Sequence, residues 1–295
     1  MREPGTPPII GIIGGSGLYE IDGLENVEWR ALYSSFGVPS DEFMFAELDG
    51  QKLVFLPRHG RGHHIPPSEL NFRANIDALK RANVTEILSL SAVGSLREDI
   101  PPGTFVIVDQ FIDRTFAREK SFFGTGLVAH ISMAEPVCSR LGDALADAAT
   151  ATGITAIRGG SYLAMEGPQF SSRAESELYR QWGCDVIGMT NMPEAKLARE
   201  AEMCYATVAM VTDFDCWHPD HDDVTVETII KVLTENADKA RDLVREIVPR
   251  LSSRTETCHA GCQIALDTAL ITAPNARDPM LMEKLSAVAG RVLKS

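Results

Sequence analysis

Short apolar runs recur along most of the chain and alternate with stretches of helical periodicity. The runs are mostly continuous, which is typical of strands buried on both faces of a sheet. They cover Ile9–Ile13, Lys52–Leu56, Glu86–Ser91, Thr104–Val108, Ser161–Met165, Asp185–Met189 and Tyr205–Val211. The helical patterns cover Glu69–Arg81, Pro136–Thr152, Ser172–Trp182, Glu194–Met203 and Val226–Val248. Strands alternating with helices predict an α/β fold with helices on both faces of the sheet.

The chain changes character after the last long helical pattern. Residues 254–275 mix polar and small side chains, and Asp278 with Pro279 then caps a final helix predicted over Met280–Leu293. A tail of about 40 residues is too short to form an independent domain. We therefore predict a single domain over residues 8–250 and a C-terminal helical appendage over residues 251–295, packed on that domain or on a neighbouring subunit.

Composition limits the partners of the chain. A formal net charge of −13 over 295 residues argues against binding to nucleic acid or to an anionic membrane. The sequence has no apolar run as long as the roughly 18 residues that a membrane-spanning helix needs. Its first residues lead into a strand rather than a signal peptide, so we expect a cytoplasmic location.

Six cysteines are scattered along the chain. Four stand singly in apolar or mixed segments, where a reduced and buried thiol is expected. Cys258 and Cys262, with His259 between them, could ligate a metal ion or form a disulfide. A zinc site needs four ligands and no second pair lies nearby in the sequence, so we expect a structural or incidental role and no metal.

Two aspartates close the apolar run Tyr205–Val211. In an extended strand alternate side chains share a face, so Asp213 and Asp215 are expected to project together. One carboxyl group can donate a proton to a ring nitrogen while the other accepts a hydrogen bond from an exocyclic amine. Proton donation near neutral pH requires a raised pKa, which burial or the neighbouring carboxylate would supply.

Three loops carry candidate anion-binding groups. The turn Gly14–Leu18 follows a strand and offers backbone amides and Ser16, although taken alone it is more typical of a simple tight turn. It lacks the third glycine of a dinucleotide fingerprint and the lysine of a P-loop. Arg58–Pro67 gathers arginines and histidines that suit phosphate, a metal ion or a solvated loop. Ser91–Ser95 can present amides in the same way.

Seven motifs follow one another in a recognisable order. They are Gly14–Leu18, Arg58–His63, Gly94–Gly103, Asp109–Thr115, His130–Pro136, Glu166–Ser176 and Thr212–Trp217. Over residues 8–250 the chain resembles the 5′-methylthioadenosine phosphorylases of the trimeric purine nucleoside phosphorylase family. The resemblance implies a single-domain nucleoside phosphorylase fold with a central mixed β-sheet flanked by helices.

The resemblance also implies the activity. Such enzymes are pentosyltransferases that use phosphate to cleave the N-glycosidic bond of 5′-methylthioadenosine, giving adenine and 5-methylthioribose 1-phosphate in methionine and purine salvage. Phosphate is a co-substrate, and neither a cofactor nor a metal ion is implied. The alternative is a purine nucleoside phosphorylase acting on adenosine, inosine or methylthioinosine.

Residue by residue, the resemblance implies the following sites. Phosphate would contact Ser16, Arg58, His59, Ser91, Ala92 and Thr190. The nucleoside would contact Phe170, Ser171, Met189, Asp213, Asp215, Val224, Val226, Ile229 and His130. Within this set, Asp213 and Asp215 are the catalytic pair, serving N7 and the 6-amino group. Met189 would lie along the ribose. Phe170 would face the purine, although its ring could equally fill the core.

Specificity is predicted from two positions. Relatives that act on 6-oxopurines carry Glu and Asn where this chain has Ser171 and Asp213, and an aspartate pair suits a 6-amino group. Those relatives use His for a 5′-hydroxyl where this chain has Val226. Together with Val224 and Ile229 it would form an apolar pocket for a methylthio group, although all three also suit a helix core.

The resemblance further implies a homotrimer in which His130 reaches a neighbouring subunit's 5′ pocket. The loop Phe122–Val128 before it is apolar and broken by glycines, which suits an interface, although His130 could instead lie in a monomer's core. Two other classes stay open. A metal-dependent hydrolase would use His59, His63, His64 and the acidic segment Asp213–Asp223. A Rossmann-type binding protein is disfavoured by the incomplete glycine fingerprint.

Overall fold

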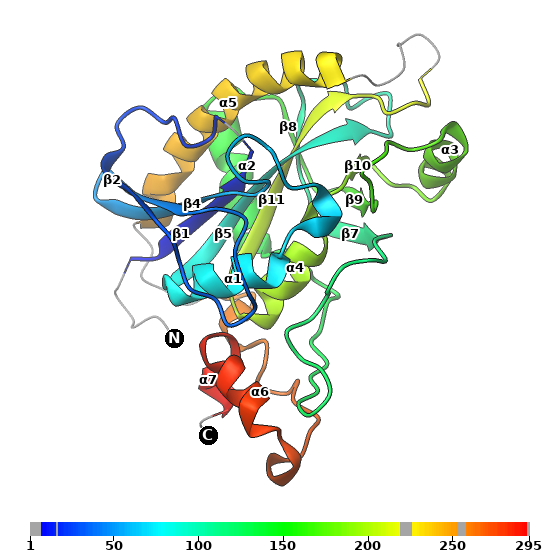
Figure 1. The fold of residues 1–295 in the computed structure, drawn as a ribbon. Helices are drawn as coiled ribbons and strands as arrows, with labels where there is room; N and C mark the ends of the chain where they lie inside the picture. Colours follow the sequence, from blue (N-terminus) through cyan, green and yellow to red (C-terminus); the bar gives the residue numbers. More distant parts are fainter. Residues whose placement is uncertain (1–6, 16, 219–225, 253–257, 294–295) are drawn as a thin grey trace.

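The computed structural model describes residues 7–15, 17–218, 226–252 and 258–293, with 226–231 described by their backbone alone. Within these residues eleven strands form one mixed sheet (Figure 1). The strands are β1 (Ile9–Gly14), β2 (Glu25–Arg30), β3 (Phe43–Leu48), β4 (Gln51–Pro57), β5 (Val84–Ser95), β6 (Phe105–Ile107), β7 (Gln110–Asp113), β8 (Ala156–Arg158), β9 (Ser161–Ala164), β10 (Val186–Gly188) and β11 (Cys204–Asp213). All seven predicted strands are present, and β2, β3, β7 and β8 are additional.

Strand β5 is the branch point of the sheet. It runs parallel to β1 and to β11 over much of its length, and at Gly94 and Ser95 it pairs antiparallel with β10. Gly94 therefore lies opposite Asp213 on one side and Ile187 on the other. This register brings the carboxyl end of β11 beside β10 and the helix that follows it.

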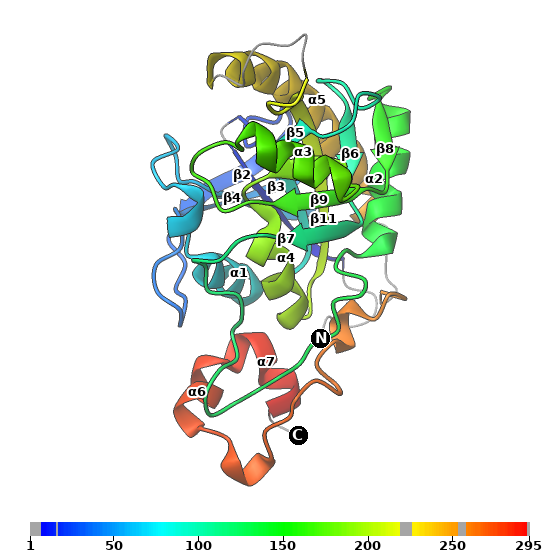
Figure 2. The same cartoon turned by 90° about the vertical axis from the view of Figure 1, so that its right-hand side faces the viewer.

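Helices cover both faces of the sheet, as the alternating pattern predicts. Helices α1 (Phe72–Arg81) and α4 (Asn191–Glu200) pack on one face, and α2 (Ser139–Ala151) and α5 (Val226–Ser252) pack on the other (Figure 1). Helix α3 (Arg173–Gln181) lies outside these layers beside β9 (Figure 2). A capping box begins α3, in which Ser172 and Glu175 bond each other's backbone amides.

The continuous apolar strands fill two separate cores. In β1, Ile10 and Ile12 belong to the cluster that contains Leu243 and Val244 of α5. Ile13 belongs to the opposite cluster, together with side chains of α1 and α4. Because both faces of β1 are covered, almost every residue of the strand is apolar, which is why an unbroken run marks it in the sequence.

The C-terminal appendage packs on its own chain. The final helix is broken at Leu285 into α6 (Pro279–Lys284) and α7 (Ser286–Leu293), so the prediction of one helix over Met280–Leu293 is wrong. The break allows Leu285, which is fully buried, to join the main core. Asp278 caps α6 as expected, and α7 packs on α1 (Figure 2).

Two polar contacts fasten the appendage to the domain. Arg291 of α7 bonds the carboxylate of Glu202, with Nε to Oε2 at 2.8 Å. Glu202 Oε1 also accepts from the backbone amide of Leu266 at 2.9 Å. In the described part of the chain, no helix combines the length and the apolar character that crossing a membrane requires.

Candidate active site

The two aspartates meet at a turn rather than along a strand. Asp213 is the last residue of β11, and Asp215 follows with a positive φ of 50°. The prediction that strand alternation alone places both side chains on one face is therefore wrong. Instead, the backbone N–H of Asp215 donates to Asp213 Oδ1 at 2.8 Å. The turn holds the Asp213 carboxyl group in a fixed orientation.

Asp213 is placed to hold a proton. The Thr212 hydroxyl lies 2.7 Å from Asp213 Oδ2 and 3.1 Å from the carbonyl oxygen of Val93. A hydroxyl has one hydrogen, so when Thr212 donates to the carbonyl it can accept from a protonated Asp213. Burial raises the pKa of Asp213, and the charge of Asp215 adds to the rise.

Asp215 carries an unused acceptor. It is 7% exposed, and its Oδ2 has no hydrogen-bond partner among the described residues. Burial is also the largest cause of its raised pKa, partly opposed by the hydroxyls of Ser176 and Ser171. A buried carboxylate oxygen without a donor is costly, and an amino group of a ligand would satisfy it.

The segment before α3 lies against this turn. The thiol of Cys216 donates to the carbonyl oxygen of Ser171 at 3.3 Å, which joins the segment to the residues after Asp215. Ser171 is buried, whereas the ring of Phe170 is 45% exposed. Phe170 therefore does not fill the core, and an exposed aromatic face beside a polar pair is suited to stacking on a heterocycle.

A second set of predicted residues meets where β5 and α4 approach each other. The hydroxyl oxygens of Ser91 and Thr190 are 2.9 Å apart, and Ser91 Oγ is 3.3 Å from the hydroxyl of Tyr162. Ala92 is the next residue of β5 and is half-buried. Sequence reasoning did not identify Tyr162, which also accepts from the Thr190 amide at 3.5 Å.

Arg58 is buried and already paired. Its Nε donates to Glu194 at 2.9 Å, and its two Nη groups bond Glu194, Ser89 and the carbonyl oxygen of Leu90. The fork of the guanidinium thus faces Glu194. Nη2 also lies 3.4 Å from the carbonyl oxygen of Ile13. Of the five N–H groups, these contacts use one on Nε, two on Nη2 and one on Nη1, so one Nη1 hydrogen has no acceptor among the described residues and could bind an anion.

His59 follows Arg58 and is held as a neutral ring. Its Nδ1 lies 2.8 Å from the carbonyl oxygen of Ile65, which only accepts, so Nδ1 carries the proton and Nε2 is free to accept. Burial lowers the pKa of His59 to about 4, and the Arg58 charge contributes. The His59 ring stacks on His63 at a centroid separation of 4.3 Å. A phosphate hydroxyl is a suitable donor to Nε2.

A buried polar network supports these groups. Asn191 Nδ2, which has two hydrogens to donate, lies 2.6, 2.9 and 3.0 Å from the hydroxyl oxygens of Tyr205, Thr207 and Ser89. Tyr205 in turn donates to Glu194 at 2.9 Å. The network links β5, β11 and the start of α4, and so fixes the residue before Asn191, which is Thr190. No sequence pattern predicts this network, because its members come from three separate elements.

Met189 has a fixed backbone. Its carbonyl oxygen accepts from Arg118 Nη1 at 2.5 Å, and Arg118 also pairs with Glu166 at 3.2 Å. Gly167 is required beside it, since a Cβ there would lie 2.5 Å from Met189 Sδ in a backbone with φ of 68°. Met189 and the Phe170 segment are therefore held together through Arg118, Glu166 and Gly167.

Several predicted residues are not tested by these contacts. Ser16 and Val224 lie outside the described residues. Val226 and Ile229 belong to the first turn of α5, where the backbone alone is described. Their roles stay predictions.

The structure explains the apolar loop before His130 differently from the prediction. Phe122, Phe123 and Leu127 are buried in the core of their own chain, so the apolar composition of the loop needs no interface. His130 itself is exposed, which excludes the alternative of a core histidine. Its amide donates to Ala269 of the appendage at 2.9 Å. The loop between β7 and α2 extends toward α6 and α7 (Figures 1 and 2).

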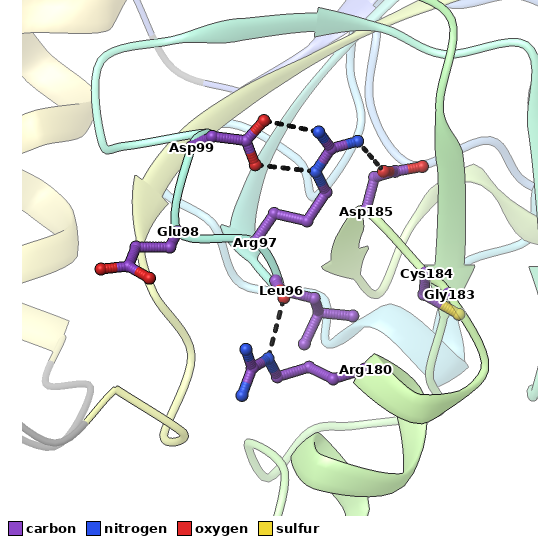
Figure 3. A pocket seen from close by; sticks show the side chains of 8 residues that line it. All are labelled: Leu96, Arg97, Glu98, Asp99, Arg180, Gly183, Cys184 and Asp185. Carbon is purple, nitrogen blue, oxygen red and sulfur yellow. Dashed lines mark hydrogen bonds and ion pairs between the residues drawn. The ribbon is translucent and has the colours of Figure 1, made fainter.

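A surface hollow of about 370 Å³ lies beside α3 but contains none of the predicted site residues (Figure 3). Arg97 spans it and pairs with Asp99 and Asp185. Arg180 Nε donates to the carbonyl oxygen of Leu96 at 3.0 Å. Arg97 is thus paired with two carboxylates, and we assign the hollow no role.

Metal binding at the predicted histidines finds no support among the described residues. Among the described residues, one set of side chains lies close enough together to hold a metal ion, and it includes neither His59 nor Asp213. It consists of Cys138, Cys204, Cys258 and Cys262. The expectation that Cys258 and Cys262 lack further ligands is therefore wrong. Cys138 and Cys204 are distant in sequence, and only the fold brings them to the pair.

Comparison with known proteins decides the family. A model of the phosphorylase superfamily matches residues 9–249. An S-methyl-5′-thioadenosine phosphorylase from Rhodospirillum rubrum is 64% identical over 99% of this chain and 100% of its own. The chain belongs to the phosphorylase superfamily, among the S-methyl-5′-thioadenosine phosphorylases.

Solved structures of this family agree with the fold. A methylthioadenosine phosphorylase from an Antarctic soil metagenomic library superposes with a TM-score of 0.91 at 45% identity, covering 96% of this chain and 99% of that one. The Schistosoma mansoni methylthioadenosine phosphorylase in complex with adenine gives 0.84 at 36% identity, covering 89% and 99%. The predicted fold class and family are confirmed, and a Rossmann-type binding protein is set aside.

Proposed function

We propose that the chain is a pentosyltransferase that cleaves 5′-methylthioadenosine with phosphate, giving adenine and 5-methylthioribose 1-phosphate. The observation that carries the proposal is the buried pair at the end of β11. Asp213 has a raised pKa and a hydroxyl neighbour, and one oxygen of Asp215 has no partner in the described part of the chain. The name of the Rhodospirillum rubrum relative supports the same substrate.

The pair divides the work on the base. Breaking the bond between C1′ and N9 leaves its electron pair on adenine, and negative charge develops on the ring. Asp213 donates its proton to N7 and neutralises that charge as it forms. Asp215 Oδ2 accepts from the 6-amino group, which selects adenine over a 6-oxopurine. Phe170 stacks on the ring face.

Phosphate completes the reaction from the other side. One of its oxygens forms the new bond to C1′ as the bond to N9 breaks, and its charge stabilises the cationic sugar. The remaining Nη1 hydrogen of Arg58, the hydroxyls of Ser91 and Thr190, and the turn at Ser16 hold the anion. The neutral ring of His59 accepts a hydrogen bond from the hydroxyl of the phosphate. Glu194 already balances Arg58, so binding depends on directed donors more than on net charge.

The remaining proposals rest on the resemblance. Residues 8–250 form the catalytic domain and residues 251–295 the appendage. Val224, Val226 and Ile229 line an apolar pocket for the methylthio group, Met189 lies along the ribose, and phosphate is the one co-substrate. The chain works in the cytoplasm as a homotrimer in which His130 reaches a neighbouring site, a position that its exposure allows.

A panel of nucleosides with phosphate tests the substrate. The kcat/KM should be highest with 5′-methylthioadenosine, lower with adenosine, and lowest with inosine and methylthioinosine. The missing 6-amino group should cost about 1–3 kcal/mol or more, because Asp215 would then keep an unpaired buried oxygen. A preference for inosine would contradict the role of the aspartate pair, whereas a preference for adenosine would contradict the apolar 5′ pocket alone.

A further inference from the structure

Four buried cysteines meet on the side of the molecule where the appendage joins the domain. Cys138 precedes α2, Cys204 begins β11, and Cys258 and Cys262 belong to the appendage. Their sulfur atoms all lie within 4.8 Å of one another. The sulfur atoms of Cys138 and Cys258 are 3.5 Å apart, and those of Cys258 and Cys262 are 3.8 Å apart.

These separations are those of a metal site rather than of a disulfide. Sulfur atoms in a disulfide are about 2 Å apart. Four sulfurs around a tetrahedral zinc ion at a bond length of about 2.3 Å lie about 3.8 Å from one another. The cluster needs only small side-chain movements to adopt that geometry, and every described cysteine is a free thiol.

Two arginines face the cluster. Arg199 Nη1 donates toward the sulfur of Cys262 at 3.5 Å. The side chain of Arg140 is 8% exposed and lies near Cys204 and Cys138. One Nη group of Arg140 bonds Glu86, but its Nε and Nη1 have no hydrogen-bond partner among the described residues.

Guanidinium groups in these positions suit a cysteine cluster that holds a metal cation. Four thiolates around a divalent cation carry a net charge of −2, and N–H donors directed at the sulfurs stabilise that charge. Without the cation, two nitrogen atoms of the buried Arg140, which carry three N–H groups between them, have no acceptor among the described residues, and this is costly. A cation bound by the four sulfurs would give these N–H groups acceptors at the cluster.

We propose that Cys138, Cys204, Cys258 and Cys262 bind one zinc ion in a closed structural site. Four protein ligands fill a tetrahedral zinc ion and leave no position for substrate, so the ion takes no part in the reaction. Cys204 and Asp213 stand at opposite ends of β11, about 30 Å apart at 3.3 Å per residue. The zinc ion fastens the appendage to α2 and β11.

Metal content tests the proposal directly. The untagged chain is purified without a metal-chelating column, and zinc is measured by mass spectrometry. About one zinc ion per chain is expected in the unmodified protein and in the control Cys184→Ser, which removes a buried thiol outside the cluster. Cys258→Ser and Cys262→Ser should each retain less than about one fifth of that zinc.

A second measurement avoids any dependence on how the variants fold. Organomercurial titration of the unmodified protein, followed with a zinc-sensitive dye, should release the zinc as the cluster thiols react. Substitution by cobalt should give the visible absorption of a tetrahedral tetrathiolate. The proposal is overturned if protein prepared with zinc in every buffer contains none in stoichiometric amount. It is equally overturned if peptide mapping finds a disulfide among these four cysteines.

Discussion

Gly94 lies so close to Asp213 that a single methyl group at Gly94 would reach the carboxylate. A Cβ at Gly94 would stand 2.8 Å from Asp213 Oδ1 and 3.3 Å from the backbone nitrogen of Asp215. The branch in β5 requires this proximity, because Gly94 pairs with β11 and β10 at once. The same residue that lets the sheet branch therefore gives the Asp213 carboxyl group its place.

We predict that Gly94→Ala moves the Asp213 carboxyl group and lowers kcat by about 10- to 100-fold, since displacements near 1 Å cost that much in a positioned catalytic group. Steady-state kinetics with 5′-methylthioadenosine measure the effect. Gly290→Ala is the control, because Cβ there meets no atom within 4 Å. Unchanged kinetics in Gly94→Ala would show that the position of Asp213 does not limit turnover.

The two carboxyl groups should respond differently to amidation. Asp213→Asn removes the proton donor at N7 and should lower kcat far more than Asp215→Asn does. The amide at position 213 can still hydrogen-bond the ring, so the preference for 6-aminopurines should weaken as well. Equal and small losses in the two variants would mean that neither carboxyl group acts as the acid.

Stability without ligands should depend on pH through His59. Burial lowers the folded-state pKa of His59 from 6.5 to about 4, so between these values the unfolded chain binds a proton that the folded chain does not. This contribution to the free energy of unfolding is present above pH 6.5 and falls by up to about 3 kcal/mol as the pH drops through the window. Glu200, whose pKa burial raises to about 7, acts in the opposite direction.

Comparison of variants isolates the contribution of His59 to the pH dependence of stability. Urea unfolding at about pH 7.5 and about pH 5 should show a smaller loss of stability in His59→Asn than in the unmodified chain. His64→Asn, which changes an exposed imidazole, is the control. If His59→Asn and the unmodified chain lose stability equally over this interval, the neutral buried imidazole is disproved.

A single substitution should change the preference of the 5′ pocket from a methylthio group to a hydroxyl group. Val226→His supplies a polar partner and fills apolar volume, so the preference should move from 5′-methylthioadenosine toward adenosine by about 1–3 kcal/mol. The ratio of kcat/KM for the two nucleosides measures it. An unaltered ratio would place Val226 away from the ligand.

Much of the fold could be predicted because its main strands are buried on both faces. Three of the four strands that the pattern missed, β2, β7 and β8, have other surroundings. β2 is an edge strand with mostly exposed side chains, and β7 and β8 are only four and three residues long. Such strands leave no apolar run, since sheet pairing rather than burial defines them.

The site was predictable only in part, for a related reason. Asp213 was recognisable because it directly follows the apolar run of a strand, and the end of a strand can be identified from neighbouring residues in the sequence. The partner of Arg58 was not, because Glu194 lies 136 residues away and meets it only in the folded chain. The turn at Asp215 and the four-cysteine cluster likewise depend on backbone geometry and on tertiary proximity, which spacing does not encode.

The most direct test of the account is the product formed from 5′-methylthioadenosine with and without phosphate. With phosphate, phosphorus NMR should detect a sugar 1-phosphate in equal amount to the adenine released. Without phosphate, adenine release should stop. Release of free 5-methylthioribose at the same rate in phosphate-free buffer would contradict phosphorolysis and with it the assigned roles of Arg58, His59 and Asp213.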